Sequence, residues 1–206
     1  MSARPFVLGL TGSIGMGKTT VSGFFQALGV PVLDADATVH TLYAEGGEAV
    51  PLVGAAFPGV VQGGAVDRQA LSLRVVGPTN EASMRLLESL VHPLVERRRV
   101  DFLARAASLG ARLAVLDVPL LYETGLDAQC DAVAVVSAGA QAQRSRVLAR
   151  PGMSEAKLDS ILARQLPDAE KRRRADLLIE TGCSLEETRT AVEALVRRLA
   201  EHGTLS

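Results

Sequence analysis

The chain carries near its N-terminus the stretch Gly12-Ser13-Ile14-Gly15-Met16-Gly17-Lys18-Thr19. It fits G-x-x-x-x-G-K-[ST], a glycine-rich loop that binds phosphate. The apolar run at 6–10 before the loop is typical of a buried parallel strand. After the loop, apolar residues recur at helical spacing up to Leu28, and Gly29 and Pro31 end that helix. The order strand, glycine loop, helix is the context that this motif requires.

The loop predicts a site for the phosphates of ATP. Its glycines let the backbone curl so that successive N–H groups point at one anion, at the positive end of a helix. Lys18 is expected to reach the β- and γ-phosphates, and the Thr19 hydroxyl can ligate Mg²⁺. The alternative is a glycine-rich turn before a helix with a surface lysine, which the flanking strand and helix disfavour. The predicted nucleotide-binding residues are Gly12, Ser13, Ile14, Gly15, Met16, Gly17, Lys18, Thr19 and Thr20.

Length and composition limit the classes of protein that fit. At 206 residues, a single domain with insertions is expected, and 48% hydrophobic residues supply a sizeable core. The net charge of −1 gives no excess of positive charge of the kind that indicates binding to nucleic acids or membranes. Five phenylalanines, two tyrosines and no tryptophan leave little for stacking on bases. We therefore expect neither nucleic-acid nor membrane partners.

The cysteines and the N-terminal residues bear on location. Cys130 and Cys183 are isolated and lack metal-ligand spacing, which is typical of a protein in a reducing cytosol. The first residues run directly into the predicted strand with no signal peptide, and no run of 18 apolar residues occurs. A cytoplasmic enzyme is the expectation.

Strand and helix signals alternate along the chain and predict an α/β fold. After 6–10, apolar strands are expected at 30–33, 113–118, 131–136 and 176–179. Ligands of parallel α/β sheets bind at the carboxyl ends of the strands, where the phosphate loop also opens. Side chains that follow these strands are therefore candidates for the site.

Three aspartates stand at such strand ends. Asp34 and Asp36 follow the strand at 30–33, and one of them can simply cap the next helix. We favour Asp34 for that structural role and Asp36 for chemistry. Asp117 ends the strand at 113–118, the usual place for a carboxylate that supports Mg²⁺, although this signal is loose by itself.

The segment at 45–109 is mostly helical in pattern and exceeds 60 residues, too long for a simple crossover between strands. We interpret it as a helical insertion that covers the acceptor substrate. One helix is expected to open at Asp67, and another to be interrupted at His92-Pro93. A histidine beside a proline is more often a structural residue than a ligand.

A cationic segment at 140–175 lies between the fourth and fifth strands. Its positive charges include six arginines and one lysine: Arg144, Arg146, Arg150, Lys171, Arg172, Arg173 and Arg174. Such residues can form a solvated helix pair with i,i+4 ion pairs. Guanidinium groups also suit the charge that builds on phosphoryl oxygens during transfer. We favour a lid that closes over the triphosphate, and which arginine acts stays open.

Taken together, these residues resemble one known family, dephospho-coenzyme A kinase. The loop with its flanks looks like that family's phosphate loop, and the other stretches resemble its aspartate, histidine-proline, proline-leucine-leucine-x-glutamate, lid and last-strand motifs. The stretches that carry the likeness are 9–21, Val32-Leu-Asp-Ala-Asp36, Leu90-Val-His-Pro93, Val118-Pro-Leu-Leu-Tyr-Glu123, Gln143-Arg144 with Arg150, Gln165 and Ala175-Asp176.

The resemblance implies ATP-dependent phosphorylation of the ribose 3′-hydroxyl of dephospho-coenzyme A. It also implies a P-loop NTPase fold: a five-stranded parallel sheet flanked by helices, a helical coenzyme A-binding part at 45–109 and a lid at 140–175, within one domain of residues 1–206. Lys18, Asp36 and Arg144 then form the catalytic set, with Asp36 as the base. The predicted substrate-binding residues are Asp36, His92, Leu120 and Glu123.

The sequence departs from the family pattern in places, and other functions stay open. Serine is more usual at Met16, phenylalanine-glycine at Phe57-Pro58, and asparagine near Glu180-Thr181. The first departure is compatible with the loop because a backbone amide binds there. A kinase of the nucleoside monophosphate or shikimate type is one alternative. A nucleotide-switch ATPase is another, and a GTPase is disfavoured because no NKxD motif occurs.

Overall fold

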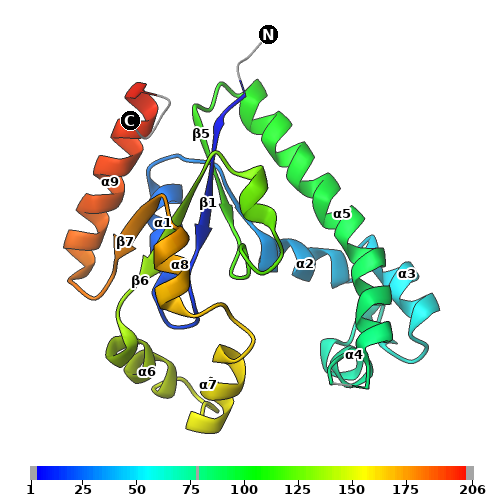
Figure 1. The fold of residues 1–206 in the computed structure, drawn as a ribbon. Coiled ribbons are helices and arrows are strands. Elements are labelled where there is room, and N and C mark those ends of the chain that lie inside the picture. The colour runs from blue at the N-terminus through cyan, green and yellow to red at the C-terminus, as the bar shows by residue number, and fades with distance from the viewer. Residues whose placement is uncertain (1–3, 78, 203–206) are drawn as a thin grey trace. The chain divides into compact units, whose positions relative to one another are not determined.

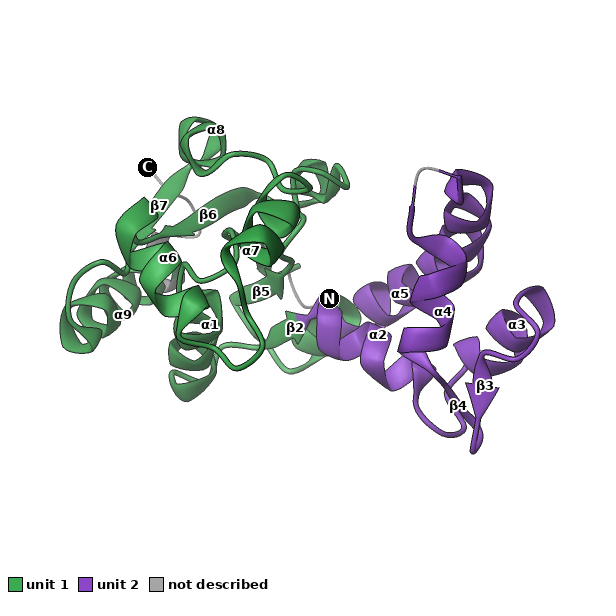
Figure 2. Ribbon diagram, turned by 90° about the horizontal axis from the view of Figure 1, so that it is seen from below, with its two compact units in different colours: residues 1–33, 103–206 green, residues 34–102 purple. Residues whose placement is uncertain are grey.

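The computed structural model describes residues 4–77 and 79–202. The chain divides into two compact units, which Figure 2 shows in different colours. Unit 1 comprises residues 1–33 and 103–206, and unit 2 comprises residues 34–102. Among the described helices, none is long and apolar enough to cross a membrane.

Unit 1 is built on a five-stranded parallel sheet, which confirms the predicted α/β class. Its strands in spatial order are β2 (Val32–Asp34), β5 (Leu113–Asp117), β1 (Phe6–Thr11), β6 (Ala132–Ser137) and β7 (Leu177–Glu180). The central strand β1 pairs in parallel with both β5 and β6. Leu10 lies opposite Asp117 in this register, so the carboxyl ends of β1 and β5 meet at one edge of the sheet.

Helices cover both faces of this sheet. α1 (Lys18–Ala27) and α9 (Leu185–His202) lie on one face, and α8 (Asp168–Arg174) lies on the other (Figure 1). The core between the sheet and the first two helices is apolar because alternate strand side chains point to it. Its buried residues include Leu8, Leu10, Val21, Phe25, Val115, Ala134, Val136, Ile179, Val192 and Leu195. Ser184 and Glu187 cap the start of α9 reciprocally: the Glu187 carboxylate accepts from the Ser184 amide, and the Ser184 hydroxyl accepts from the Glu187 amide.

Two more helices follow β6 along the chain. α6 (Ala140–Leu148) packs against α7 (Glu155–Leu162), which begins after Ser154. The Ser154 hydroxyl accepts a hydrogen bond from the Lys157 amide at 3.3 Å and caps α7. A short 3₁₀ helix spans Leu126–Gln129 between β5 and β6.

Unit 2 is a helical unit with its own apolar core. It contains α2 (Ala35–Tyr43), α3 (Ala49–Ala56), the hairpin of β3 (Val61–Gln62) and β4 (Ala65–Val66), α4 (Arg68–Val75) and most of α5 (Glu81–Ser108). Its core includes Leu42, Ala49, Val53, Phe57, Val60, Leu71 and Val91. Asp67 caps α4 as predicted, since its carboxylate accepts from the amides of Gln69 and Ala70.

The predicted interruption at His92-Pro93 is wrong. α5 runs without a break from Glu81 to Ser108, with Pro93 inside it. A proline inside a helix removes one backbone hydrogen bond and costs about 3 kcal/mol. Here residues on both sides of Pro93, Leu90, Val91, Leu94 and Val95, pack into the core of unit 2, and this burial offsets the loss.

The hairpin of β3 and β4 was not predicted, because the segment at 45–109 is mostly helical in pattern. Gly63 and Gly64 connect its strands with φ values of +56° and +78°. Two consecutive residues with positive φ match the tight turns that join antiparallel strands. The strands are only two residues each, too short to show an alternating pattern in the sequence.

Candidate active site

The phosphate loop joins the end of β1 to the start of α1, as predicted. Gly15 and Gly17 have φ values of +79° and +89°, a region that other residues rarely adopt. A Cβ at Gly12 would lie 2.7 Å from the Val136 carbonyl oxygen, so a side chain there would collide with β6. The loop sequence is therefore dictated by the backbone path and by close packing.

The backbone amides of this loop supply hydrogen-bond donors. Gly17 precedes α1 and makes no side-chain cap. Within the described chain, the amides of Gly15, Gly17, Lys18 and Thr19 have no hydrogen-bond acceptor. Unpaired amides at the positive end of a helix form a ready site for an anion. This geometry fits the predicted contact with nucleotide phosphates.

Lys18 forms an ion pair with Asp117 beside this loop. Asp117 ends β5 and is only 2% exposed, and the Lys18 side chain is 15% exposed. Because Leu10 at the end of β1 pairs with Asp117 in the sheet, Asp117 lies beside the loop and within reach of Lys18. Asp117 therefore holds the Lys18 ammonium at the mouth of the loop, a role that the sequence left undecided.

The segment after β5 contains two of the predicted substrate residues. Leu120 is 39% exposed. The Glu123 carboxylate accepts hydrogen bonds from the Leu166 amide at 2.6 Å and from Lys171 Nζ at 3.0 Å. Lys171 is fully buried and also donates to the Pro119 carbonyl at 3.1 Å. Glu123 is therefore bonded to Lys171 and to the Leu166 amide within the protein. Its contact with substrate stays a prediction.

The environment of Glu123 favours its charged form. Burial alone raises the pKa of this carboxyl, but hydrogen bonds from Leu166 and Lys171 outweigh burial and hold the pKa below its ordinary value. Nearby, burial raises the pKa of the Tyr122 hydroxyl to about 12, with the Asp176 charge as a smaller cause. Glu123 is therefore ionised and Tyr122 neutral at neutral pH.

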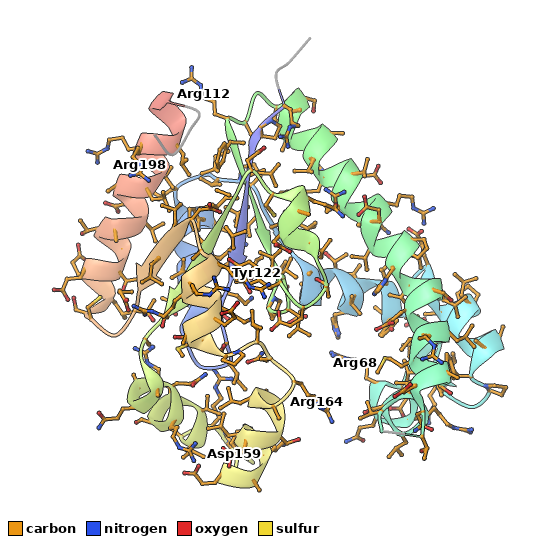
Figure 3. The ribbon with its side chains drawn as sticks, viewed as in Figure 1. Arg68, Arg112, Tyr122, Asp159, Arg164 and Arg198 are labelled. Atoms are coloured by element: carbon orange, nitrogen blue, oxygen red, sulfur yellow. The ribbon has the colours of Figure 1, made fainter. Side chains whose placement is uncertain are left out.

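The cationic segment uses several arginines in ion pairs of its own. Arg144 on α6 pairs with Glu155 and, at 3.3 Å, with Asp159, which Figure 3 labels on α7. Arg146 donates to the Thr181 carbonyl at 2.6 Å. These pairs join α6 to α7 and to the end of β7. A contact between Arg144 and phosphate stays a prediction.

The remaining predicted residues belong to unit 2. Asp34 caps α2, since its carboxylate accepts from the Ala37 amide at 2.9 Å, which confirms the structural role favoured for it. Asp36 is exposed in the first turn of the same helix, and His92 is exposed on α5. An exposed carboxylate without a capping role fits the chemical role predicted for Asp36.

Some contacts at the site were not predicted from the sequence. Lys171 is a buried ion-pair partner, although it stands in a run of arginines that indicates a solvated surface. The available signal was rarity, since it is one of three lysines in the chain. Thr181 is buried, and its hydroxyl donates to the Met16 carbonyl at 2.6 Å. No sequence pattern marked that contact.

Comparison with known proteins identifies the family. The sequence matches the model of the dephospho-CoA kinase family over residues 6–187. A dephospho-CoA kinase of Rhodopseudomonas palustris (strain BisB18) is 53% identical over 195 residues, which cover 95% of this chain and 96% of that protein. The chain belongs to the dephospho-CoA kinase family. All the predicted site residues lie inside the matched range.

Solved structures agree with this family in fold. A crystal structure of a protein from Thermus thermophilus is 35% identical, with a TM-score of 0.80 over 96% of this chain and 99% of that one. A dephospho-CoA kinase from Campylobacter jejuni is 19% identical, with a TM-score of 0.63 over 96% of this chain and 98% of that one, and it shows the shared fold alone. The resemblance inferred from the motifs and the P-loop kinase fold are both confirmed.

Proposed function

We propose that this chain transfers the γ-phosphoryl group of ATP to the ribose 3′-hydroxyl of dephospho-coenzyme A, the last step of coenzyme A synthesis. Membership of the dephospho-CoA kinase family over residues 6–187 carries the proposal. The phosphate loop supports it, because its unpaired amides and Lys18 fit a polyphosphate. The proposal includes a cytoplasmic location, with no nucleic-acid partner.

The residues of unit 1 hold the donor. The amides of Gly15, Gly17, Lys18 and Thr19 bind phosphate oxygens, and the Lys18 ammonium stabilises the charge that moves toward the leaving oxygen. Asp117 orients that ammonium before ATP arrives. A preoriented charge needs no reorganisation as the reaction proceeds, so it acts more strongly in the transition state.

The residues present also fit Mg²⁺ held together with ATP. The described residues contain no cluster of three or more His, Cys, Asp or Glu that could hold a metal by themselves. Mg²⁺ usually binds through one or two protein oxygens together with phosphates and water. The Thr19 hydroxyl at the start of α1 supplies one such oxygen, and Asp117 is the nearby carboxylate. Bound there, Mg²⁺ would neutralise charge on the phosphates.

The acceptor and the proton are assigned to other residues. Asp36 accepts the proton of the ribose hydroxyl and aims its oxygen for in-line attack. The helical part at 45–109 holds dephospho-coenzyme A, with His92 near it and Leu120 to Glu123 lining the site. The lid at 140–175 brings Arg144 to the transferring phosphate, where a planar guanidinium suits the charge.

The deciding experiment compares ADP release from ATP and Mg²⁺ with dephospho-coenzyme A and with water alone. We expect ADP to form with dephospho-coenzyme A, and mass spectrometry to identify coenzyme A in equal amount. Lys18→Ala is the control: its rate should fall by the ~10²–10³-fold typical of losing one electrostatic stabiliser. Circular dichroism should show that the variant stays folded, although the buried Asp117 loses its ion pair with Lys18 and the melting temperature falls. Turnover of shikimate or a nucleoside monophosphate instead, or equal ADP release with water, would overturn the proposal.

A further inference from the structure

Two glutamines hold one residue of the phosphate loop. Gln143 Nε2 on α6 donates to the Ile14 carbonyl oxygen at 2.8 Å. Gln165 Oε1, in the connection after α7, accepts from the Ile14 amide at 3.1 Å. Gln143 is 6% exposed, so its amide depends on this contact far more than a surface glutamine would. Both ends of the segment between β6 and α8 therefore reach the same residue.

The consequence follows from the geometry of the peptide bond. The described peptide bonds are trans, so the N–H of Gly15 points away from the carbonyl of Ile14 in the same peptide unit. When Gln143 fixes that carbonyl, it also fixes the direction of the Gly15 N–H. The preceding peptide unit is held as well, because Ser13 O accepts from the Met16 amide at 3.2 Å and Ile14 N donates to Gln165.

Of the four polar groups in these two peptide units, three are thus bonded within the protein. The fourth, the Gly15 N–H, has no acceptor in the described chain. An orphan backbone donor is costly unless something accepts it, and an anion is the natural acceptor in a glycine-rich loop. The pattern singles out the Gly15 amide as the donor that the surrounding contacts orient.

α6 also packs closely against the loop at Gly15. A Cβ at Gly15 would collide with the Val147 side chain, and it would lie 3.1 Å from the Gln143 carbonyl oxygen. Val147 is fully buried, so α6 cannot shift away cheaply. Gly15 therefore lets α6 approach closely enough for Gln143 to reach the Ile14 carbonyl.

We propose that Gln143, assisted by Gln165, is a positioning residue that aims the Gly15 N–H at the phosphates of ATP. The inference rests on the proposed kinase function and deepens it. Without Gln143 the Ile14–Gly15 peptide can rotate, and a rotated unit presents a carbonyl oxygen to the anion where an N–H should stand. ATP binding then loses one donor and gains a repulsive dipole.

The experiment measures steady-state constants of Gln143→Met, which keeps the side-chain length but removes the donor. The KM for ATP should rise about tenfold, the effect of losing one hydrogen bond to a charged group, with the KM for dephospho-coenzyme A unchanged. ATP affinity measured by calorimetry without acceptor should fall by the same factor. Gln141→Met, exposed on the same helix, is the matched control and should match the wild type.

A merely structural role would lower the melting temperature and leave the KM for ATP unchanged, and that result overturns the inference. If Gln143→Met does not fold, the same measurements are made on Gln165→Met, since Gln165 is only half-buried. We expect this variant to lose ATP affinity. Tighter ATP binding in Gln165→Met would mean that Gln165 competes with phosphate, which also overturns the inference. Failure of the proposed function is recognised separately, because the wild type would then form no coenzyme A.

Discussion

At the scale of single residues, the buried pair of Lys171 and Glu123 is the least expected feature. A fully buried ammonium is tolerated only when it is paired and hydrogen-bonded. Lys171 meets this condition through Glu123 and the Pro119 carbonyl. The same carboxylate accepts from the Leu166 amide, one residue after Gln165. The pair therefore fixes the connection that brings Gln165 to the phosphate loop.

Glu123→Gln should destabilise the protein by about 3 kcal/mol at neutral pH, because it leaves the Lys171 charge buried without a counter-charge. The folded-state pKa of Glu123 is lowered, so the pair's contribution is present above the unfolded pKa of about 4.3 and is lost as pH falls through the folded pKa. The difference between wild type and variant should therefore shrink below about pH 4. Urea unfolding at several pH values measures it.

The matched control for this prediction is Glu193→Gln. Glu193 pairs with Arg189 one turn away on the solvent side of α9, and such pairs contribute roughly 0–1 kcal/mol. The free energy of unfolding of Glu193→Gln should therefore differ little from that of the wild type at every pH. An equally small loss for Glu123→Gln, or a difference that grows on acidification, would contradict the role assigned to the buried pair.

The two aspartates around the start of α2 should separate chemistry from structure. Asp34 caps the helix, whereas Asp36 lies exposed in its first turn. Asp36→Asn keeps the shape but removes basicity, so single-turnover transfer should fall by roughly 10²–10⁴-fold with normal ATP binding. Asp34→Asn should lose stability more than chemistry. Wild-type transfer by Asp36→Asn would move the base to another carboxylate, Asp117 or Glu123.

At the scale of elements, the sequence predicted what local rules determine. The order of strand, glycine loop and helix followed from one motif, and five apolar runs gave five strands. The ends of strands were less predictable: one strand expected at 30–33 is observed at Val32–Asp34. Its boundary depends on pairing with β5 rather than on its own residues, because the Pro31 carbonyl accepts from Val115.

Long-range contacts set what local patterns could not predict. α5 continues through Pro93 because its flanking residues bury apolar surface in unit 2. Lys171 and Gln143 are buried because they bond to residues distant in sequence, Glu123 and Ile14. Their neighbours in sequence, among them several arginines, do not indicate this burial. The positions of Lys18 and Asp117 were predicted to share one edge of the sheet. Their direct ion pair depends on the register between β1 and β5, which no single segment specifies.

The role of the lid rests on an arginine that the structure places in ion pairs with α7. Arg144 must leave or share Glu155 and Asp159 to contact phosphate. Arg144→Lys keeps the charge but not the planar fork, so kcat should fall clearly if the guanidinium contacts the transferring group. Arg198→Lys, at an exposed position on α9 outside the lid, is the control. An unchanged kcat for Arg144→Lys would leave Arg144 as a brace between α6 and α7.

At the scale of the whole molecule, the part assigned to the donor and most of the part assigned to the acceptor belong to different units. Unit 1 contains the phosphate loop, and unit 2 is a helical unit with its own apolar core. Two cores allow each unit to be stabilised by its own ligand. This arrangement suits a two-substrate enzyme, because each substrate should protect a different set of backbone amides from hydrogen exchange.

Hydrogen exchange of backbone amides should show which residues each ligand protects. ATP with Mg²⁺ should protect the amides of residues 12–20, since the loop's unpaired donors then find acceptors. Dephospho-coenzyme A should protect amides within 45–109, because binding suppresses local opening of the helices that contact it. Coenzyme A is a useful second probe, since as the product it should protect the same helices without turnover. Protection by dephospho-coenzyme A that is confined to residues 12–20 would place the acceptor on unit 1 and reject the role proposed for 45–109.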